Sequence, residues 1–497
     1  MNSFLEPLQY AFMQRALIAA VLVGVVCGTL GCYIVLRRMA LIGDALAHSV
    51  LPGVAIAFIV GADFFIGAAA AGIVTAGVIG WVTSSSRVKE DAAIGVVFTG
   101  AFALGIVLIT LIQSKSVDLF HMLFGNVLGV EDRDLYITAG ITAGVLLTLL
   151  LLYKEMLVHA FDPIFAAAIG LPARALHYLL MLLLSLTVVA ALQTVGLVLV
   201  VAMLITPAST AYLLTDRFAR MLGISAGIGV LSSLIGLFGS YHYNVSSGAA
   251  IVLVATLFFF VAILFAPERG VVVRRVRAQR AARRTATEDA LKQAHALVTE
   301  GTPVTAAALG ARMGTGTGEA RRRIATLRSQ GLLTGEALTP EGDRQAHQMI
   351  RAHRLWERYL VDEGGVSWAE VHDAAERLEH VEPVVMAEQL DAALGSPRSD
   401  PHGEPIPTPE GELEELRGRV LSDLKVGESA RIVAVREQTR EGLRRLADLG
   451  LIPASEVNVT GRENGALLVS TDGDAKRVEL ALADVVLVEE EEPTPTA

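Results

Sequence analysis

Residues 43–53 read GDALAHSVLPG and place a carboxylate and an imidazole inside a long apolar run. Ionisable side chains within a membrane span are costly, so Asp44 and His48 are candidate functional residues. Their spacing of four residues puts them on one face of a helix. A carboxylate oxygen and an imidazole nitrogen bind divalent cations well. Spacing alone leaves a second interpretation open, in which the Asp caps a helix start and the His is hydrogen-bonded inside a helical bundle.

Nine apolar runs in the first half of the chain are long enough to cross a bilayer as helices, since about 20 residues span the hydrocarbon core. The runs lie at 12–36, 41–60, 63–83, 92–113, 135–153, 174–193, 195–214, 219–239 and 248–266. They predict nine transmembrane helices, or eight if one pair forms a single broken helix. The first half is therefore expected to be an all-α polytopic membrane domain.

The cations between these runs predict how the helices are oriented. Alternate loops carry Arg37 and Arg38, Arg87 and Lys89, Lys154 and Arg174, and Arg217 and Arg220. The basic segment 269–284 falls on the same side. Because cytoplasmic loops are rich in Lys and Arg, this side is expected to be cytoplasmic, with Met1 outside. The stretch 114–134 would then be extracytoplasmic or re-entrant.

The composition divides the chain into two halves. Of 497 residues, 53% are hydrophobic and 19% are charged, a mixture that fits neither a soluble enzyme nor a protein that lies wholly in the membrane. Residues 1–268 carry 11 Lys/Arg and 13 Asp/Glu, and residues 269–497 carry 30 and 38. The first half has a net charge of −2 and the second −8, with a charge density ordinary for soluble domains. Disorder, a collagen-like chain and a small secreted module are excluded.

Several motifs of the first half resemble the permeases of ABC importers for zinc, manganese and iron. They are RRMALI at 37–42 with the stretch quoted above, KEDAAIG at 89–95, LFGN at 123–126, FDPIFA at 161–166 with GLP at 170–172, VG at 195–196 through ITPA at 205–208, and SG at 247–248. The resemblance spans about residues 10–266. It implies that Asp44 and His48 take part in metal passage, and that the chain resides in the plasma or inner membrane of a prokaryote.

The resemblance also implies partners. The segment from Asp162 to Gly170, with Pro163 and Ala166, corresponds to the family's coupling helix, which docks on an ATPase subunit; an ordinary cytosolic loop helix is the alternative. No GxxxxGK[ST] motif occurs in the sequence, so we expect no bound nucleotide and no enzymatic activity in this chain. The expected partners are a separate ABC ATPase and an extracytoplasmic metal-binding protein.

Six side chains in the second half have spacings typical of metal ligands. His353 and Glu357 are four residues apart. His372, Glu376, Glu379 and His380 follow at positions i, i+4, i+7 and i+8 of the next predicted helix. Such spacing gathers side chains on one helix face, and an oxygen-rich set without thiolates favours manganese or iron over structural zinc. The alternative is a charged, solvated face with incidental histidines.

These segments, with PHGEPIP at 401–407, resemble metal-dependent repressors of the diphtheria-toxin-repressor and manganese-regulator kind. The resemblance implies that all six are metal ligands, and it adds Asp289 from an N-terminal helix that Thr287, Glu288 and Asp289 are expected to begin. Glu376 stands where manganese-type members have Glu and iron-type members have Cys, which favours Mn²⁺, with Fe²⁺ or Zn²⁺ as alternatives. Lys292 stands where the manganese type supplies a second carboxylate, and a protonated amine cannot bind a cation.

The remaining segments of the second half predict a winged helix and a small barrel. Helical patterns near 304–312 and 317–330 and a wing at about 332–340 form a helix-turn-helix, but its second helix opens on the glycine-rich run GTGTGE at 314–319. Arg321, Arg322 and Arg323 are the candidate DNA contacts. Because the half is net acidic, whereas DNA affinity rests on neutralising phosphates, we expect these arginines to face solvent or lipid headgroups and DNA not to be a partner.

The expected architecture of the whole chain follows. A membrane domain (1–268) and a basic juxtamembrane linker (269–284) precede a winged-helix-like domain (285–345), metal-binding and dimerisation helices (346–394) and a linker (395–418). Residues 419–488 resemble a FeoA-like small β-barrel, in which Glu437 or Gln438 is a possible further ligand. An acidic tail (489–497) is expected to be disordered.

The sequence therefore favours the permease subunit of a Mn²⁺ importer whose cytosolic half senses imported metal and feeds back on transport. A homodimer is expected, because repressors of this type and symmetric permease pairs each have a two-fold axis. Three alternatives stay open: zinc or iron import by the same architecture, a membrane-tethered metal-dependent transcriptional regulator, and a permease with an inert, dimerising tail.

Overall fold

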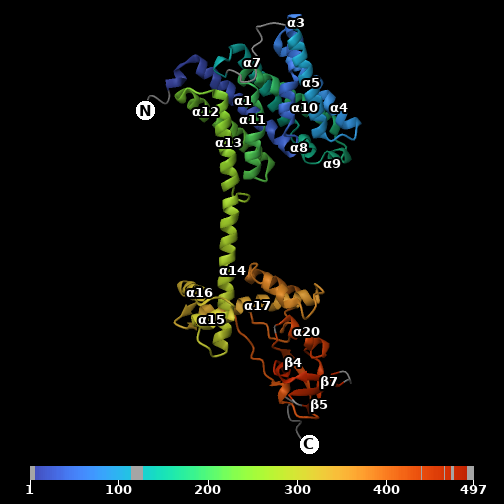
Figure 1. The fold of residues 1–497 in the computed structure, drawn as a ribbon, viewed down its shortest axis with the longest axis vertical. Coiled ribbons are helices and arrows are strands. Elements are labelled where there is room, and N and C mark those ends of the chain that lie inside the picture. The colour runs from blue at the N-terminus through green and yellow to red at the C-terminus, as the bar shows by residue number, and fades with distance from the viewer. Residues whose placement is uncertain (1–5, 113–126, 438, 464, 472–474, 490–497) are drawn as a thin grey trace. The chain divides into compact units, whose positions relative to one another are not determined.

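The computed structural model describes residues 6–112, 127–437, 439–463, 465–471 and 475–489. The motif at 123–126, Gln438 and most of the acidic tail lie outside this part of the chain. Two compact units are present, Met1–Arg277 and Ala278–Ala497 (Figure 1). Their boundary falls inside a helix, nine residues beyond the division that the composition predicts.

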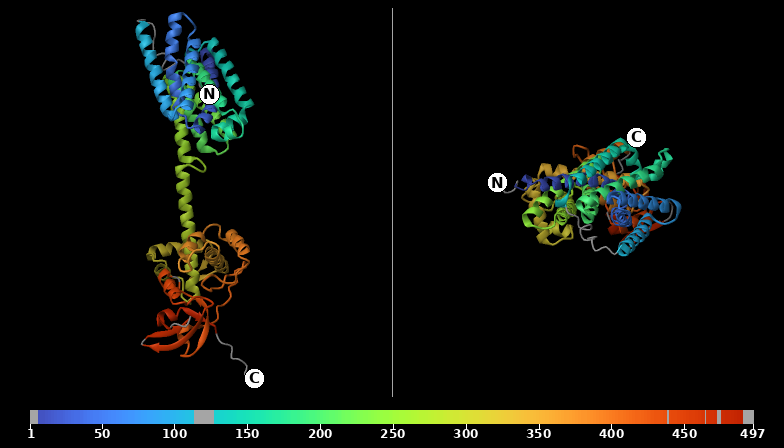
Figure 2. Two further views of the ribbon diagram at one scale, coloured as in Figure 1. Left: turned by 90° about the vertical axis from the view of Figure 1, so that its right-hand side faces the viewer. Right: turned by 90° about the horizontal axis from the view of Figure 1, so that it is seen from above.

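The first unit is a bundle of helices (Figure 1 and Figure 2). Its elements are η2 (Glu6–Gln9), α1 (Ala11–Leu36), α2 (Ile42–Ser49), α3 (Leu51–Val60), α4 (Phe64–Ser85), α5 (Glu90–Ile112), η3 (Val127–Gly129), α7 (Asp132–Leu151), α8 (Tyr153–Phe161), α9 (Pro163–Ala168), α10 (Ala173–Val195), α11 (Leu197–Leu214), α12 (Phe218–Tyr243) and α13 (Ser247–Phe265). Helices satisfy their own backbone hydrogen bonds, as a span in lipid requires. Within the described residues, nine helical segments are long and apolar enough to cross a membrane, in agreement with the nine predicted runs.

One of the nine segments is broken in the middle. The predicted run 41–60 forms two helices, α2 and α3, that meet at Val50. Pro52 lies in the first turn of α3, where its missing N–H leaves no helical hydrogen bond unmade. The break leaves Asp44 and His48 on α2, a short helix that ends just before it.

Small residues allow the membrane helices to approach closely, the usual basis of helix association in lipid. A Cβ atom on Gly53 of α3 would lie 2.1 Å from the carbonyl oxygen of Gly67 on α4. Between α1 and α12, the hydroxyl of Ser225 donates to the carbonyl oxygen of Gly28 at 2.7 Å, and that of Ser233 to Ala20 at 3.0 Å. These contacts hold α3 against α4 and α1 against α12.

The second unit begins with the winged helix that the sequence predicts. Its elements are α14 (Val271–Thr299), α15 (Ala306–Arg312), α16 (Thr317–Ser329), and the hairpin of β1 (Leu333–Thr334) and β2 (Ala337–Leu338). The prediction that a helix begins at Thr287 is wrong, because α14 already begins at Val271. The segment before Thr287 is rich in Arg and Ala, both good helix formers, and contains no Gly or Pro after Gly270.

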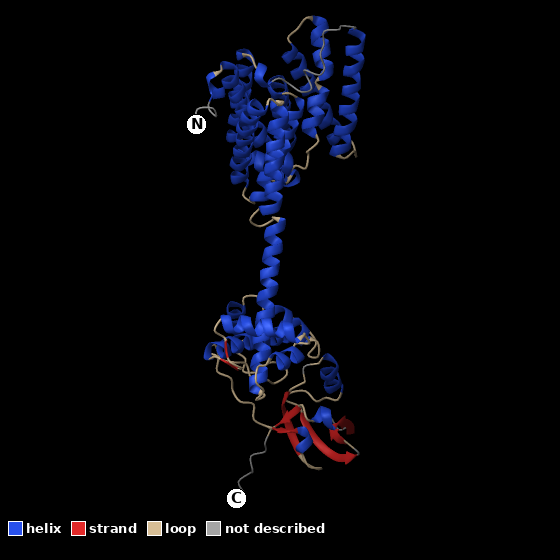
Figure 3. Cartoon of the chain, turned by 60° about the vertical axis from the view of Figure 1, so that its left-hand side comes forward, coloured by secondary structure: helices blue, strands red, loops and turns tan. Residues whose placement is uncertain are grey.

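Five further helices and a sheet complete the described part of this unit. They are α17 (Pro340–Asp362), α18 (Val371–Leu378) and α19 (Pro383–Ala393), followed by β3 (Arg419–Val420), η4 (Leu421–Asp423), β4 (Ser429–Val435), α20 (Arg440–Asp448), β5 (Glu456–Glu463), β6 (Ala466–Ser470), β7 (Ala475–Glu479), α21 (Leu480–Ala483) and β8 (Val486–Val488). The six strands pair antiparallel in the order β3-β8-β4-β5-β6-β7. Figure 3 shows the strands gathered in the C-terminal part of the chain. This sheet stands where the small barrel is expected.

The contact of α3 with α4 gives a direct test of the packing. Gly53→Ala is expected to destabilise the unit by about 1–3 kcal/mol, because the added methyl group would overlap the carbonyl oxygen of Gly67. Gly77→Ala on α4 is the matched control, since a Cβ atom there would meet nothing within 4 Å. Melting temperatures in detergent, read by size-exclusion chromatography, compare the two. Equal melting temperatures for both variants would contradict the packing described here.

Candidate metal centres

The membrane unit pairs the two side chains that the sequence singled out. His48 Nε2 lies 3.3 Å from Asp44 Oδ1. The imidazole packs against the rings of Phe98 and Phe102 of α5, with centroid distances of 5.5 and 5.3 Å. His48 Nδ1 is buried and has no hydrogen-bond partner within the described residues. A buried nitrogen with a free lone pair or proton is costly, and metal binding by the imidazole is one way to remove that cost.

Three predicted ligands of the second unit form a first cluster, on α17 and α18. Glu357 Oε1 lies 3.0 Å from His353 Nε2 and 2.9 Å from His372 Nδ1. The two imidazole nitrogens, His353 Nε2 and His372 Nδ1, are 3.1 Å apart. His353 and Glu357 share a face of α17, as their spacing predicts, and both are buried.

Two further side chains extend this cluster, and neither was predicted as a ligand from the sequence. The ligand atoms of Asp400 and His402 lie within 4.8 Å of one another and of Glu357, and all three residues are buried. Asp400 also accepts hydrogen bonds from the backbone N–H groups of His402 and Glu404, at 2.8 and 2.9 Å. The PHGEPIP motif marked this segment, but it did not indicate that the segment folds back onto α17.

A small polar cavity of about 20 Å³ adjoins the first cluster. Its lining includes His353, Glu357 and His402, and also Glu437, which follows β4. Such a volume is close to that of one water-sized sphere. Glu437, one of the two residues of the barrel segment considered as a further ligand, therefore lies at this cavity. Its alternative, Gln438, lies outside the described residues.

A second cluster joins α14 to the end of α18. His380 Nε2 lies 3.1 Å from Asp289 Oδ1 and 3.8 Å from Glu379 Oε1, while His380 Nδ1 lies 2.9 Å from Glu288 Oε2. The cluster thus brings together Asp289, Glu379 and His380. Glu288 is a further partner, which was predicted from the sequence only as part of a helix start.

Lys292 occupies part of this second cluster. Its Nζ lies 3.0 and 2.9 Å from the two carboxylate oxygens of Glu379. Glu379 is 1% exposed, and its Oε2 also contacts His353 Nδ1 in the first cluster. Burial disfavours the charged carboxylate, but the hydrogen bond from His353 and the nearby cations outweigh it and hold the pKa of Glu379 below its ordinary value.

The carboxylates also shift the pKa of their neighbours. Hydrogen bonds to Asp289 and Glu288 raise the pKa of His380 to about 9, which favours the protonated imidazole in the absence of metal. Burial, together with the charges of Glu357 and Glu404, raises the pKa of Asp400 to about 7. The His380 shift reflects the carboxylates beside it, and the Asp400 shift reflects mainly burial, with neighbouring negative charge as the second cause. A divalent cation among these side chains would balance that charge.

Four predicted candidates lie apart from both clusters. Glu376 is exposed on α18 and belongs to no group of converging ligands in the described part of the chain. Arg321 and Arg322 are exposed on α16, and Arg323 bonds to Glu319 one turn earlier at 2.9 Å. The glycine-rich opening of that helix is present, with Gly316 at its N-cap and Gly314 at a φ of 63°.

The donor sets of the two clusters differ in how well they suit a cation. The first offers imidazole nitrogens and carboxylate oxygens, a mixture suited to Mn²⁺, Fe²⁺ or Zn²⁺, and its neighbouring cation Arg354 lies 3.7 Å from Asp400. The second offers the same atom types, but the ammonium group of Lys292 competes for Glu379. The first cluster therefore fits a bound metal better than the second.

Comparison with known proteins identifies the family. A family model described as "ABC 3 transport family" matches residues 9–266, just over half of the chain. The chain belongs to this family. Asp44 and His48 both lie within residues 9–266, the range that this model matches. We call this part of the chain the ABC 3 unit. Two further models match the second unit: "Iron dependent repressor, metal binding and dimerisation domain" at 339–408, and "FeoA domain" at 419–490.

Individual relatives of the ABC 3 unit are transport proteins. The chain is 56% identical over 284 residues to "Manganese transport system membrane protein MntC" of Halalkalibacterium halodurans, covering 57% of this chain and 97% of that protein. It is 44% identical to a "Probable iron transport system membrane protein" of Haemophilus influenzae, covering 53% and 97%. A solved structure titled "PsaBC from Streptococcus pneumoniae in complex with Fab" matches with 47% identity and a TM-score of 0.50, over 54% of this chain and 97% of that one. The chain is thus a multi-pass membrane protein of a prokaryotic transport family with a repressor-like domain attached.

The contact between Lys292 and Glu379 predicts how the second cluster can be strengthened. Lys292→Glu is expected to tighten Mn²⁺ binding there by about tenfold or more, because it removes a competing cation and adds a carboxylate. Mn²⁺ titration of the purified full-length protein, followed by electron paramagnetic resonance, measures the change. Gln293→Glu also adds a carboxylate, one residue away, where Gln293 accepts a hydrogen bond from Arg312, and is expected to leave binding unchanged. An unaltered isotherm for Lys292→Glu would contradict the competition described.

Proposed function

We propose that this chain is the membrane permease subunit of an ABC importer for Mn²⁺ and that its C-terminal unit senses the imported metal. The observation that carries the transport proposal is the 56% identity, across 97% of its length, to a manganese transport membrane protein. Iron is the second candidate cargo, because a 44% identical relative is described as a probable iron transport protein.

The transport pathway is proposed to pass Asp44 and His48. Both lie on α2, immediately before the break at Val50, and their ligand atoms are 3.3 Å apart. A carboxylate and an imidazole can replace part of the hydration shell of Mn²⁺. Among the residues that the structure describes, the Nδ1 atom of His48 has no hydrogen-bond partner, which supports a role beyond packing.

ATP hydrolysis is assigned to a separate subunit, which would dock at α9. The side chain of Asp162 caps this short helix by accepting from the N–H groups of Ile164 and Phe165, at 2.8 and 2.9 Å. Four apolar side chains around it are exposed: Phe161, Ile164, Phe165 and Ile169. An exposed apolar patch marks an interaction site, which supports α9 as the coupling helix. An extracytoplasmic binding protein would deliver the metal to the opposite side.

The C-terminal unit is proposed to lie in the cytoplasm and to report the metal concentration there. The match of residues 339–408 to a metal-binding and dimerisation domain supports both metal sensing and a homodimer. The convergence of His353, Glu357 and His372 supplies the site. We expect occupancy of this site to slow transport, and a coupling free energy of about 1–3 kcal/mol would give 5–150-fold control.

The pathway proposal predicts a loss of uptake when either ligand is removed. Asp44→Asn and His48→Gln are each expected to lower Mn²⁺ uptake by about tenfold or more, because removal of a ligand weakens binding by at least that factor. Uptake of radioactive Mn²⁺ by vesicles that contain the complete importer measures this. Asp63→Asn is the control, since that carboxylate caps α4 and pairs with Arg133 away from α2. Full uptake by both ligand variants would refute the pathway, and transport of Fe²⁺ but not Mn²⁺ would change the cargo.

The sensing proposal is tested by varying internal Mn²⁺ independently of external Mn²⁺. Uptake by the native chain is expected to fall as internal Mn²⁺ rises. In the double variant Glu357→Gln/Glu379→Gln, uptake is expected to stay constant as internal Mn²⁺ rises, because both substitutions remove ligand charge from the clusters. The measurement is the ratio of uptake at high and low internal Mn²⁺, and Asp373→Asn, exposed on α18, is the control. If the double variant shows the same ratio as the native chain, the sensing proposal is wrong, while the transport proposal is unaffected.

A further inference from the structure

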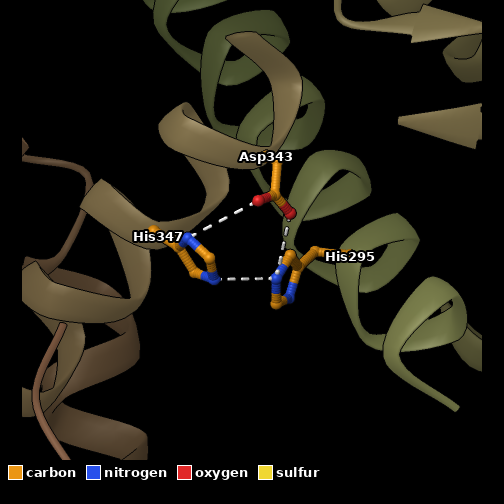
Figure 4. Close-up of side chains that lie close together, drawn as sticks. All are labelled: His295, Asp343 and His347. Atoms are coloured by element: carbon orange, nitrogen blue, oxygen red, sulfur yellow. Dashed lines mark hydrogen bonds and ion pairs between the residues drawn. The ribbon is translucent and has the colours of Figure 1, made fainter. Parts of the chain in front are cut away.

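A third group of potential ligands in the C-terminal unit is separate from the two clusters described above. His295 lies on α14, and Asp343 and His347 lie one turn apart on α17 (Figure 4). His295 Nε2 is 3.1 Å from His347 Nε2 and 3.4 Å from Asp343 Oδ1. His347 Nδ1 is 3.7 Å from Asp343 Oδ2. Residues 52 positions apart in the sequence thus present two imidazoles and a carboxylate to one point.

The spacing of these atoms suits a small divalent cation. When nitrogen and oxygen ligands lie 2.0–2.1 Å from a tetrahedral metal, their mutual distances are about 3.3 Å. The distances of 3.1 and 3.4 Å from His295 Nε2 to His347 Nε2 and Asp343 Oδ1 lie on either side of that value. One ligand atom from each of the three residues lies within 4.8 Å of the other two.

The surroundings of this group favour neutral imidazoles that can bind metal, and they leave one side open for a cation to enter. The side chains of His295 and His347 are only 12% and 13% exposed, whereas that of Asp343 is 49% exposed. Burial and the neighbouring His347 lower the pKa of His295, and the neutral imidazole is the form that binds metal. A cation can approach past the open carboxylate, and water can complete its coordination.

We propose that His295, Asp343 and His347 form a third metal site, which takes a divalent first-row transition ion with a preference for Zn²⁺ over Mn²⁺. Two imidazoles and one carboxylate with an open fourth position match the three-ligand sites that zinc occupies. Sites of nitrogen and oxygen donors generally bind Zn²⁺ more tightly than Mn²⁺. The cluster around Glu379 is richer in carboxylates, whereas the group of His353, Glu357 and His372 has the same donor types as the third site and differs from it in position.

Binding at this site would tie two helices together. His295 belongs to the winged-helix part of α14, and Asp343 and His347 belong to the first turns of α17, the helix that also carries His353 and Glu357. A metal shared by α14 and α17 would fix the start of α17 against the winged helix. The third site is therefore able to respond to zinc without occupying the manganese ligands. This inference holds whether or not the chain senses Mn²⁺ for feedback.

The test compares Zn²⁺ stoichiometry in matched variants of the full-length protein. Purified protein in detergent, stripped of metal, is titrated with Zn²⁺ against a chromogenic chelator. His295→Gln with His347→Gln is expected to bind one fewer Zn²⁺ per chain than the native protein. X-ray absorption of the zinc-loaded protein is expected to show a smaller average number of imidazole ligands. Glu341→Gln is the control, because it removes a carboxylate from the same end of α17 that bonds to Arg344 instead.

Two results would overturn the proposal. The first is an unchanged Zn²⁺ stoichiometry in the double histidine variant, provided that its metal-free melting temperature matches that of the native protein. If the double variant fails to fold, Asp343→Asn is tested in its place. The side chain of Asp343 is exposed, so this substitution is expected to have little effect on folding. That variant is expected to bind one Zn²⁺ at least about tenfold more weakly, and native affinity at every Zn²⁺ site would overturn the proposal.

Discussion

A buried carboxylate needs cationic or hydrogen-bonding partners, and the side chain of Glu379 shows how the C-terminal unit meets this requirement. Glu379 is almost fully buried and contacts Lys292, His353 and, more distantly, His380. Breaking a buried charge pair by removal of one partner typically costs about 3–5 kcal/mol. The contacts of Glu379 connect α14, α17 and the end of α18. The positions of both metal-ligand clusters therefore depend on one carboxylate.

This dependence also explains why the two clusters are not independent. A cation bound by Asp289 and His380 would draw on the same carboxylate that now stabilises Lys292 and His353. Any rearrangement at Glu379 would reach the first cluster through its contact with His353 Nδ1. The residue types alone do not reveal this link, because it arises from a side chain shared by two sites.

Much of the membrane unit could be predicted from sequence, because lipid forces each long apolar run to form a helix. The break at Val50 was harder to foresee, since Pro at a helix start and Pro inside a helix look alike in the sequence. In the C-terminal unit, the spacing of His353 with Glu357 predicted their common helix face. Asp400, His402 and His295 escaped notice because their partners are distant in sequence, and local periodicity carries no information about such contacts. The early start of α14 was missed because a basic run was interpreted as a linker, although Arg and Ala favour a helix.

The exposed apolar side chains around α9 have a consequence for the life of the protein in the cell. Phe161, Ile164, Phe165 and Ile169 present a surface that would bind other proteins non-specifically if the partner for it were absent. Quality-control proteases and chaperones remove proteins that display such surfaces. If an ATPase subunit docks on α9 as proposed, the abundance of this permease should follow the supply of that subunit, and synthesis of the two in step would itself limit how many pores accumulate.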